Sequence, residues 1–245
     1  QLPEATYSPS MLDFNYTQMK RSYNITVFIF TVLVSFTGCK KYFDVGENPN
    51  QITDPPLNTL LTTATSKTAN SNYNVANITS YFTQYLASPS VGGSTDTYQL
   101  TDYSTTWNAI YFAMADINEM KKKALASGAT EHVGVADILM AYHLNLIVDL
   151  WGSGPYSEAF NQSILTPKYD DAEALFNAGL GLINGGLTEL AKTDATVKLG
   201  TGDDLIYNGD LTKWIKFGNL LKARMLNKIT KKASYDPAAV LAAVS

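Results

Sequence analysis

Cysteine and histidine, two residue types that often carry chemistry, are scarce in this 245-residue sequence. Cys39 is the single cysteine, so the chain can form neither an internal disulfide nor a cysteine-ligated metal cluster. The two histidines, His132 and His143, fall on one predicted helix and lie about 16 Å apart at 1.5 Å per residue, too far to share a metal ion. Sequence motifs of phosphate-binding loops, zinc proteases and serine hydrolases are absent as well. We therefore expect no enzymatic activity, no metal site and no cofactor.

Charged residues are also few, at 16% of the sequence, and the net charge is −4. Binding to nucleic acid needs a basic surface that displaces counterions from phosphates, so this balance argues against a nucleic-acid-binding protein. Hydrophobic residues reach 45%, which is enough for a packed core and unlike a disordered chain. The composition therefore predicts a folded, weakly acidic protein.

The uncharged apolar run at residues 25–38 has 14 residues, whereas a membrane-spanning helix needs about 20. It follows the basic pair Lys20 and Arg21 and ends in small residues, which is the layout of a secretory signal. We predict a signal peptide over residues 19–38 and interpret residues 1–18 as upstream or fragment sequence. A permanent membrane anchor and a buried core helix are the alternatives.

Cys39 stands directly after this run, in the sequence Phe-Thr-Gly-Cys, which is typical of a bacterial lipobox. Its thiol would accept a lipid, and several acyl chains, at about 0.8 kcal/mol per buried CH₂, would anchor the chain stably. We therefore predict lipid attachment at Cys39, followed by a proline-containing tether over residues 39–56. The alternatives are a buried apolar thiol and a catalytic nucleophile.

Beyond the tether, apolar residues recur at helical spacing and no convincing strand pattern occurs. Helices are predicted from residue 57, over about 74–87, 106–125 and 131–150, after a cap at Asp170, after a cap at Asp210, and from Pro237. Glu173 completes the capping-box pattern with Asp170. The sequence predicts an all-α domain over residues 57–245, built from antiparallel, repeat-like helix pairs.

The loop at residues 88–105 is long and polar, which favours a functional or mobile segment. Aromatic side chains can stack on sugar rings or peptide side chains while neighbouring polar groups orient the ligand. We therefore select four candidate ligand-binding residues in and beside the loop: Asp96, Tyr98, Tyr103 and Trp107. The alternative for Trp107 is a core position on the helix that follows.

A second acidic group invites comparison with a calcium-binding loop. Its members are Asp203, Asp204, Asn208 and Asp210. Their spacing does not match the alternating ligand pattern of an EF-hand, and Asp210 is already predicted to cap a helix. A structural loop with a helix cap is therefore the favoured interpretation, with calcium binding as the alternative.

Four segments together resemble the SusD/RagB family of surface nutrient-binding lipoproteins of Bacteroidetes. They are "CKKYFDVGENPN" (39–50), "LMAYHLNLIVDLWGSGPYSEAF" (139–160), "YDDAEALF" (169–176) and "DLIYNGDLTKWIKFGNLLKARM" (204–225), and they occur in the family's order. The resemblance implies an α-helical fold with tetratricopeptide-like helix pairs and no catalysis. Family members usually run about twice this length, so the chain is expected to be an N-terminal part, incomplete at its C-terminus.

The resemblance also implies a function. We expect a lipid-anchored, surface-exposed outer-membrane protein that captures oligosaccharide or peptide and passes it to a SusC-like, TonB-dependent transporter. None of the matching segments transfers a ligand residue: Trp151 and Tyr156 are expected to pack a turn, and Trp214 and Arg224 to pack or pair within a helix. A helical surface lipoprotein with a structural or adhesive role and no small ligand is the alternative.

Overall fold

The computed structural model describes residues 19–30 and 54–245. The chain divides into two units, Gln1–Asp54 and Pro55–Ser245, which are considered separately. In the first unit residues 19–30 are helical, and their apolar side chains are exposed. Cys39, the rest of the predicted signal peptide and most of the predicted tether lie outside the described residues.

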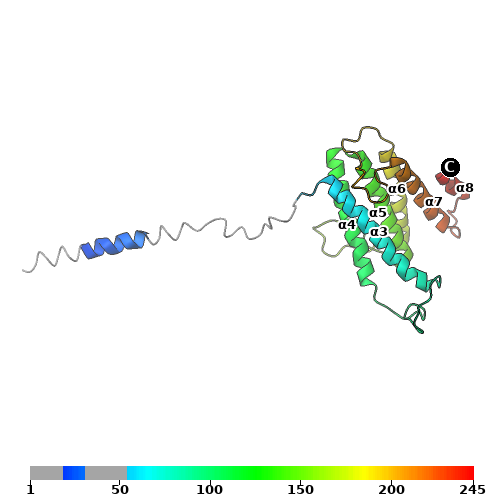
Figure 1. The fold of residues 1–245 in the computed structure, drawn as a ribbon, viewed down its shortest axis with the longest axis horizontal. Coiled ribbons are helices and arrows are strands. Elements are labelled where there is room, and N and C mark those ends of the chain that lie inside the picture. Colours follow the sequence, from blue (N-terminus) through cyan, green and yellow to red (C-terminus); the bar gives the residue numbers. More distant parts are fainter. Residues whose placement is uncertain (1–18, 31–53) are drawn as a thin grey trace, which may run out of the picture. The chain divides into compact units, whose positions relative to one another are not determined.

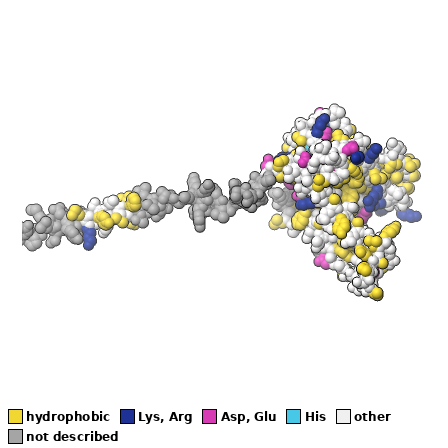
Figure 2. Space-filling view, viewed as in Figure 1, with side chains coloured by type: hydrophobic (Ala, Val, Ile, Leu, Met, Phe, Trp, Pro, Cys, Tyr) yellow, Lys and Arg dark blue, Asp and Glu magenta, His cyan; other side chains and the backbone are white. Residues whose placement is uncertain are grey.

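The second unit is built from helices, as predicted (Figure 1). They are α3 (Leu57–Phe82), α4 (Ser104–Ser127), α5 (Thr130–Trp151), α6 (Ala172–Leu190), α7 (Leu211–Lys228) and α8 (Pro237–Val244). No strand occurs in the described ranges, where the β-type pairing is confined to an isolated bridge between Gly154 and Asp170. The last helix, α8, packs on α7, and Figure 2 shows apolar side chains at its surface, where Leu241 and Val244 are exposed.

Helix α5 is the centre of the core and packs against α4 and α6. Within the described part of the chain, α5 is the one helix long and apolar enough to cross a membrane, but most of its apolar stretch is buried inside the protein. Gly134 of α5 and Gly186 of α6 allow these two helices to approach closely. A Cβ atom on either glycine would lie 2.8 Å from the other's carbonyl oxygen. The buried, strongly apolar character of residues 133–147 therefore reflects a core position.

The first helix of this unit differs from its prediction. Two helices were expected, from residue 57 and over about 74–87, but α3 is continuous through the polar residues between them. Buried threonines make this possible because their hydroxyls donate to carbonyl oxygens one turn earlier. Thr65 Oγ1 bonds Leu61 O at 2.8 Å, and Thr68 Oγ1 bonds Ala64 O at 2.7 Å. Because the threonine hydroxyl groups form hydrogen bonds within the helix, this part of α3 can pack against the core.

Most predicted helix ends are confirmed. Asp210 caps α7 by accepting a hydrogen bond from Lys213 N at 3.2 Å, and α8 begins at Pro237. The predicted cap of α6 is wrong by one residue. Asp171, not Asp170, accepts from Ala174 N at 2.8 Å. A local sequence pattern cannot tell which of two adjacent aspartates caps a helix. In the structure Asp170 instead fixes a loop by accepting hydrogen bonds from Tyr156 N and Ser157 N.

The acidic loop before α7 has a structural role. Asp204 is buried, and its carboxylate accepts hydrogen bonds from the backbone N–H groups of Ile206, Tyr207 and Gly209, and from the indole Nε1 of Trp214 at 2.7 Å. Four donors therefore use the oxygens that calcium would need. This arrangement supports the interpretation of residues 203–210 as a loop and cap.

Candidate functional site

An open hollow of about 530 Å³ lies where the start of α4, the end of α5 and the segment before α6 meet. It is lined by Thr101, Asp102, Tyr103, Ser104, Trp107, Asn108, Trp151, Ser153 and Tyr169. Both aromatic rings and polar side chains are present in its lining. We call it the aromatic hollow.

Trp107 is the central ring of the aromatic hollow. The Trp151 ring meets it edge to face, with centroids 4.9 Å apart and an angle of 87°. The Tyr169 ring lies nearly parallel to it, at 6.1 Å and 17°, and is 65% exposed. Tyr111 supports Trp107 from the next turn of α4, at 4.7 Å, and its hydroxyl donates to Pro155 O. Rings held in such geometries attract one another, so the cluster is fixed before any ligand arrives.

Asp102 gives the rim of the hollow a fixed negative charge. Its Oδ1 accepts a hydrogen bond from Ser104 N at 2.8 Å, and the Ser104 hydroxyl donates to the same oxygen. These hydrogen bonds from Ser104 lower the pKa of the Asp102 carboxyl. The exposed carboxylate retains oxygen lone pairs that can accept hydrogen bonds from a ligand's hydroxyl groups.

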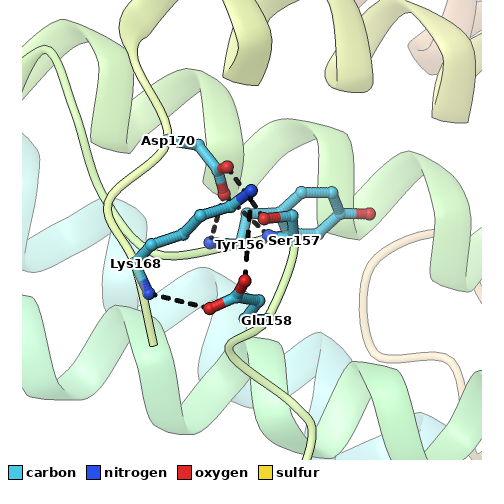
Figure 3. A network of polar contacts seen from close by, with 5 residues as sticks. All are labelled: Tyr156, Ser157, Glu158, Lys168 and Asp170. Carbon is cyan, nitrogen blue, oxygen red and sulfur yellow. Dashed lines mark hydrogen bonds and ion pairs between the residues drawn. The ribbon is translucent and has the colours of Figure 1, made fainter. Parts of the chain in front are cut away.

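A carboxylate clasp holds the segment that carries Tyr169 (Figure 3). Asp170 Oδ2 accepts from the backbone N–H groups of Tyr156 at 3.0 Å and Ser157 at 2.7 Å, and Oδ1 accepts from the Ser157 hydroxyl at 2.8 Å. Burial raises the pKa of Asp170, but the hydrogen bonds from Ser157 and Tyr156, with the charge of Lys168, outweigh it and lower the pKa. We call these interactions the Asp170 clasp.

Two further contacts tie the same loop together. The backbones of Gly154 and Asp170 exchange two hydrogen bonds, at 3.0 and 3.1 Å. The Glu158 carboxylate accepts from the backbone N–H of Lys168 at 3.1 Å and faces its ammonium group at 4.0 Å. The turn that ends α5 and the segment that leads into α6 are therefore joined on both sides of Tyr169.

Of the four residues selected from the sequence, two line the aromatic hollow and two do not. Tyr103 and Trp107 line it, and Trp107 is half-buried there. Asp96 instead accepts a hydrogen bond from Ser88 N at 3.0 Å within its own loop. The Tyr98 hydroxyl donates to Phe82 O at 3.2 Å, which ties the loop to the end of α3. The structure thus divides the predicted group into a pair at the hollow and a pair that shapes the loop.

Sequence reasoning missed the other seven residues that line the hollow, among them Asp102, Trp151, Ser153 and Tyr169. Trp151 was interpreted only as packing a turn. Its ring also contacts Trp107 edge to face and lines the hollow. The available signal was the density of aromatic residues beside glycines and a proline in residues 151–156, which marks a turn that exposes rings.

The two histidines lie in the core, away from the hollow. His143 Nδ1 donates to Leu139 O at 2.8 Å, so its Nε2 is the unprotonated nitrogen, and Nε2 has no partner among the described residues. Burial lowers the pKa of His143 to about 4, and burial also lowers that of His132. Both histidines are therefore neutral core residues at neutral pH.

Solved structures with the same fold were found by structural comparison. A SusD/RagB family protein from Bacteroides thetaiotaomicron aligns with a TM-score of 0.68 at 22% identity, over 78% of this chain and 42% of that one. A chitin-binding protein aligns with a TM-score of 0.55 at 26% identity, over 67% and 35%. A chitin-binding SusD homolog from Flavobacterium johnsoniae aligns at 0.51 and 22%, over 59% and 30%. The chain thus spans less than half the length of these structures.

Comparison with curated proteins found no match. A family model does match: the SusD-like model described as "Starch-binding associating with outer membrane" covers residues 49–245. That match includes every helix of the second unit. The helical architecture and the extent of the match show that this chain belongs to the SusD-like family.

Proposed function

We propose that this chain binds oligosaccharide at the aromatic hollow. The observation that carries the proposal is the ring cluster, in which the exposed Tyr169 lies parallel to Trp107 and Trp151 stands edge-on. Flat aromatic faces bind the apolar faces of sugar rings, and a few fixed polar groups orient the hydroxyl groups. Asp102, Ser104 and Asn108 supply those polar groups here.

Similarity to known proteins supports a glycan as the ligand. The family's description names starch, and two of the structural neighbours are chitin-binding proteins. The hollow of this chain is lined by aromatic and uncharged polar side chains, with Asp102 as its one charged residue. A neutral oligosaccharide therefore suits it better than a charged peptide.

The wider role follows the family's association with the outer membrane. In this proposal a signal peptide over residues 19–38 directs export, Cys39 carries the lipid, and the tether at residues 39–56 holds the helical domain at the cell surface. The bound glycan is then delivered to a SusC-like, TonB-dependent transporter. The chain's part is capture and presentation, without catalysis.

Calorimetric titration of the full chain tests the binding step. The probes are oligomers of N-acetylglucosamine and of α-1,4-linked glucose. Trp107→Ala removes the central ring and is expected to weaken binding of the preferred probe by at least about tenfold, equivalent to 1.4 kcal/mol. Tyr85→Ala, at an exposed tyrosine outside the hollow, is the matched control and should leave the affinity unchanged.

Two results would contradict the proposal. Undiminished affinity in Trp107→Ala would place the ligand elsewhere on the protein. Failure of the unaltered chain to bind any oligomer of either series would favour a structural or adhesive role.

A further inference from the structure

A second hollow, of about 360 Å³, lies further along α4, on the other side of the turn that follows α5. Its lining includes Asn118, Lys121, Asp137, Tyr156, Phe160 and Asn161. Amide, charged and aromatic side chains thus meet in one place. None of them belongs to the aromatic hollow.

The second hollow is lined by an ion pair that is largely removed from water. Lys121 Nζ lies 2.5 Å from Asp137 Oδ1, and the two side chains are 30% and 7% exposed. Burial raises the pKa of Asp137, while the charge and hydrogen bond of Lys121 oppose the increase. A pair in such a position contributes little to stability compared with apolar residues of the same size. It does offer a donor and an acceptor side by side to a polar ligand.

Aromatic and amide groups form the walls. The Tyr156 and Phe160 rings are 6.5 Å apart at 75°. The Oδ1 atom of Asn161 accepts from Ser163 N at 3.0 Å, which orients the amide, and its Nδ2 donors have no protein partner among the described residues. Ring faces beside oriented amides and an ion pair are the groups that bind sugar rings and their hydroxyls.

Helix α4 connects the two hollows. Asn108 borders the aromatic hollow and Asn118 borders the second one, about 15 Å apart at 1.5 Å per residue. Phe112, which is 64% exposed, and Ala115 lie between them at helical spacing on the same stripe. A further hollow of about 550 Å³ includes Ala115 and shares Asn118 with the second hollow, so the depression continues along α4.

The turn after α5 serves both hollows as well. Ser153 lines the aromatic hollow, and Tyr156 and Ser157 line the second one. The Asp170 clasp binds the backbone at 156 and 157 and stands beside Tyr169 in the chain, so the same carboxylate fixes rings of both hollows.

We propose that the second hollow is a saccharide subsite, and that a chain-like saccharide held at the aromatic hollow extends along α4, over Phe112, to reach it. This inference rests on the proposed function. A ligand long enough to occupy both hollows gains the second set of contacts within one binding event, so affinity rises steeply with ligand length. A ligand of two sugar units occupies the aromatic hollow alone.

The test compares short and long ligands on the full chain. The probes are the dimer and the hexamer of N-acetylglucosamine and of α-1,4-linked glucose, measured by calorimetry. Phe160→Ala and Asn161→Ala should each weaken binding of the hexamer about fivefold to tenfold and leave the dimer unchanged. Asn184→Ala, at an exposed asparagine of α6 outside both hollows, is the control and should change neither affinity. Circular dichroism shows whether each variant is folded.

The outcomes separate this inference from the proposed function. If Trp107→Ala weakens both ligands but the two second-hollow variants bind the hexamer as the unaltered chain does, the subsite is wrong and the aromatic hollow stands. If only the second-hollow variants weaken the hexamer, the aromatic hollow is wrong and the second hollow is the binding site. If the unaltered chain binds neither series, both proposals are overturned.

Discussion

The interior of the α5–α6 pair and the turn beyond α5 differ in the roles that their histidine and aromatic residues have. Histidines, which often carry chemistry, are neutral packing residues inside α5. Tryptophan and tyrosine, which usually fill cores, line an open hollow around the turn. What distinguishes the two regions is whether rings and polar atoms remain accessible. Exposure and free bonding capacity therefore identify the candidate site better than residue type does.

In the interior region, the largest expected change in the free energy of unfolding comes from disturbing the close contact of α5 with α6. In Gly134→Ala the new Cβ would lie 2.6 Å from Leu190 Cγ and 2.8 Å from Gly186 O, and a backbone atom cannot rotate away. We expect the free energy of unfolding in urea to fall by about 3 kcal/mol. Gly181→Ala is the matched control, because its Cβ meets nothing within 4 Å. It should stabilise α6 by about 0.5 to 1 kcal/mol. Equal effects of the two substitutions would show that the helices are not in close contact.

The second prediction concerns the interior region as well, and it uses the pH dependence of stability that the buried His143 causes. The pKa of His143 is about 4 in the folded protein and 6.5 in the unfolded chain, so the unfolded chain binds the extra proton in this window. Stability is then lost as pH falls from 6.5 toward 4, by about 2 kcal/mol between pH 7 and pH 5. His143→Leu should remove most of that slope in urea unfolding, and His132 would account for the remainder. An unchanged slope would mean that His143 is accessible to water when folded.

The smallest expected change in stability comes from weakening the Asp170 clasp, and it tests whether the clasp holds the turn after α5 in place. In Asp170→Asn one of the two carboxylate oxygens becomes a donor, so the hydrogen bonds at 156 and 157 weaken. We expect a loss of about 1.5 kcal/mol of stability and about threefold weaker binding of oligosaccharide, because Tyr169 is less firmly held. Asp171→Asn is the control, since asparagine caps a helix as well as aspartate does. If the two variants behave alike, the clasp has no special role.

Local chemistry was enough to predict much of the fold. The cap at Asp210, the proline at 237 and the glycines after Trp151 fix helix ends through contacts within a few residues, and the structure places those ends accordingly. The continuity of α3 could not be predicted. Its threonines favour loops in isolation and become helical because their hydroxyls bond within the helix while their faces pack on the core.

The candidate site was predictable only in small part for a related reason. Tyr103 and Trp107 were found because they lie in and beside a long polar loop, which is a local signal. Trp151 and Tyr169 reach the hollow only after α5 and the segment before α6 have been joined through Asp170, a residue that sequence reasoning assigned to a helix cap. A contact between residues 14 positions apart leaves no periodic pattern.

Two of the three hydrogen bonds of the Asp170 clasp come from backbone N–H groups, so they do not depend on which side chain stands at those positions. Any residue except proline supplies the N–H groups that the carboxylate accepts at positions 156 and 157. A substitution at position 156 can change the ring that borders the second hollow while every hydrogen bond of the clasp remains, whereas replacing Ser157 also removes its hydroxyl bond to Asp170. One carboxylate therefore holds the loop backbone while the side chain at position 156 is free to vary. In the proposed saccharide subsite, variation at that position would alter ligand preference while the helices stay the same.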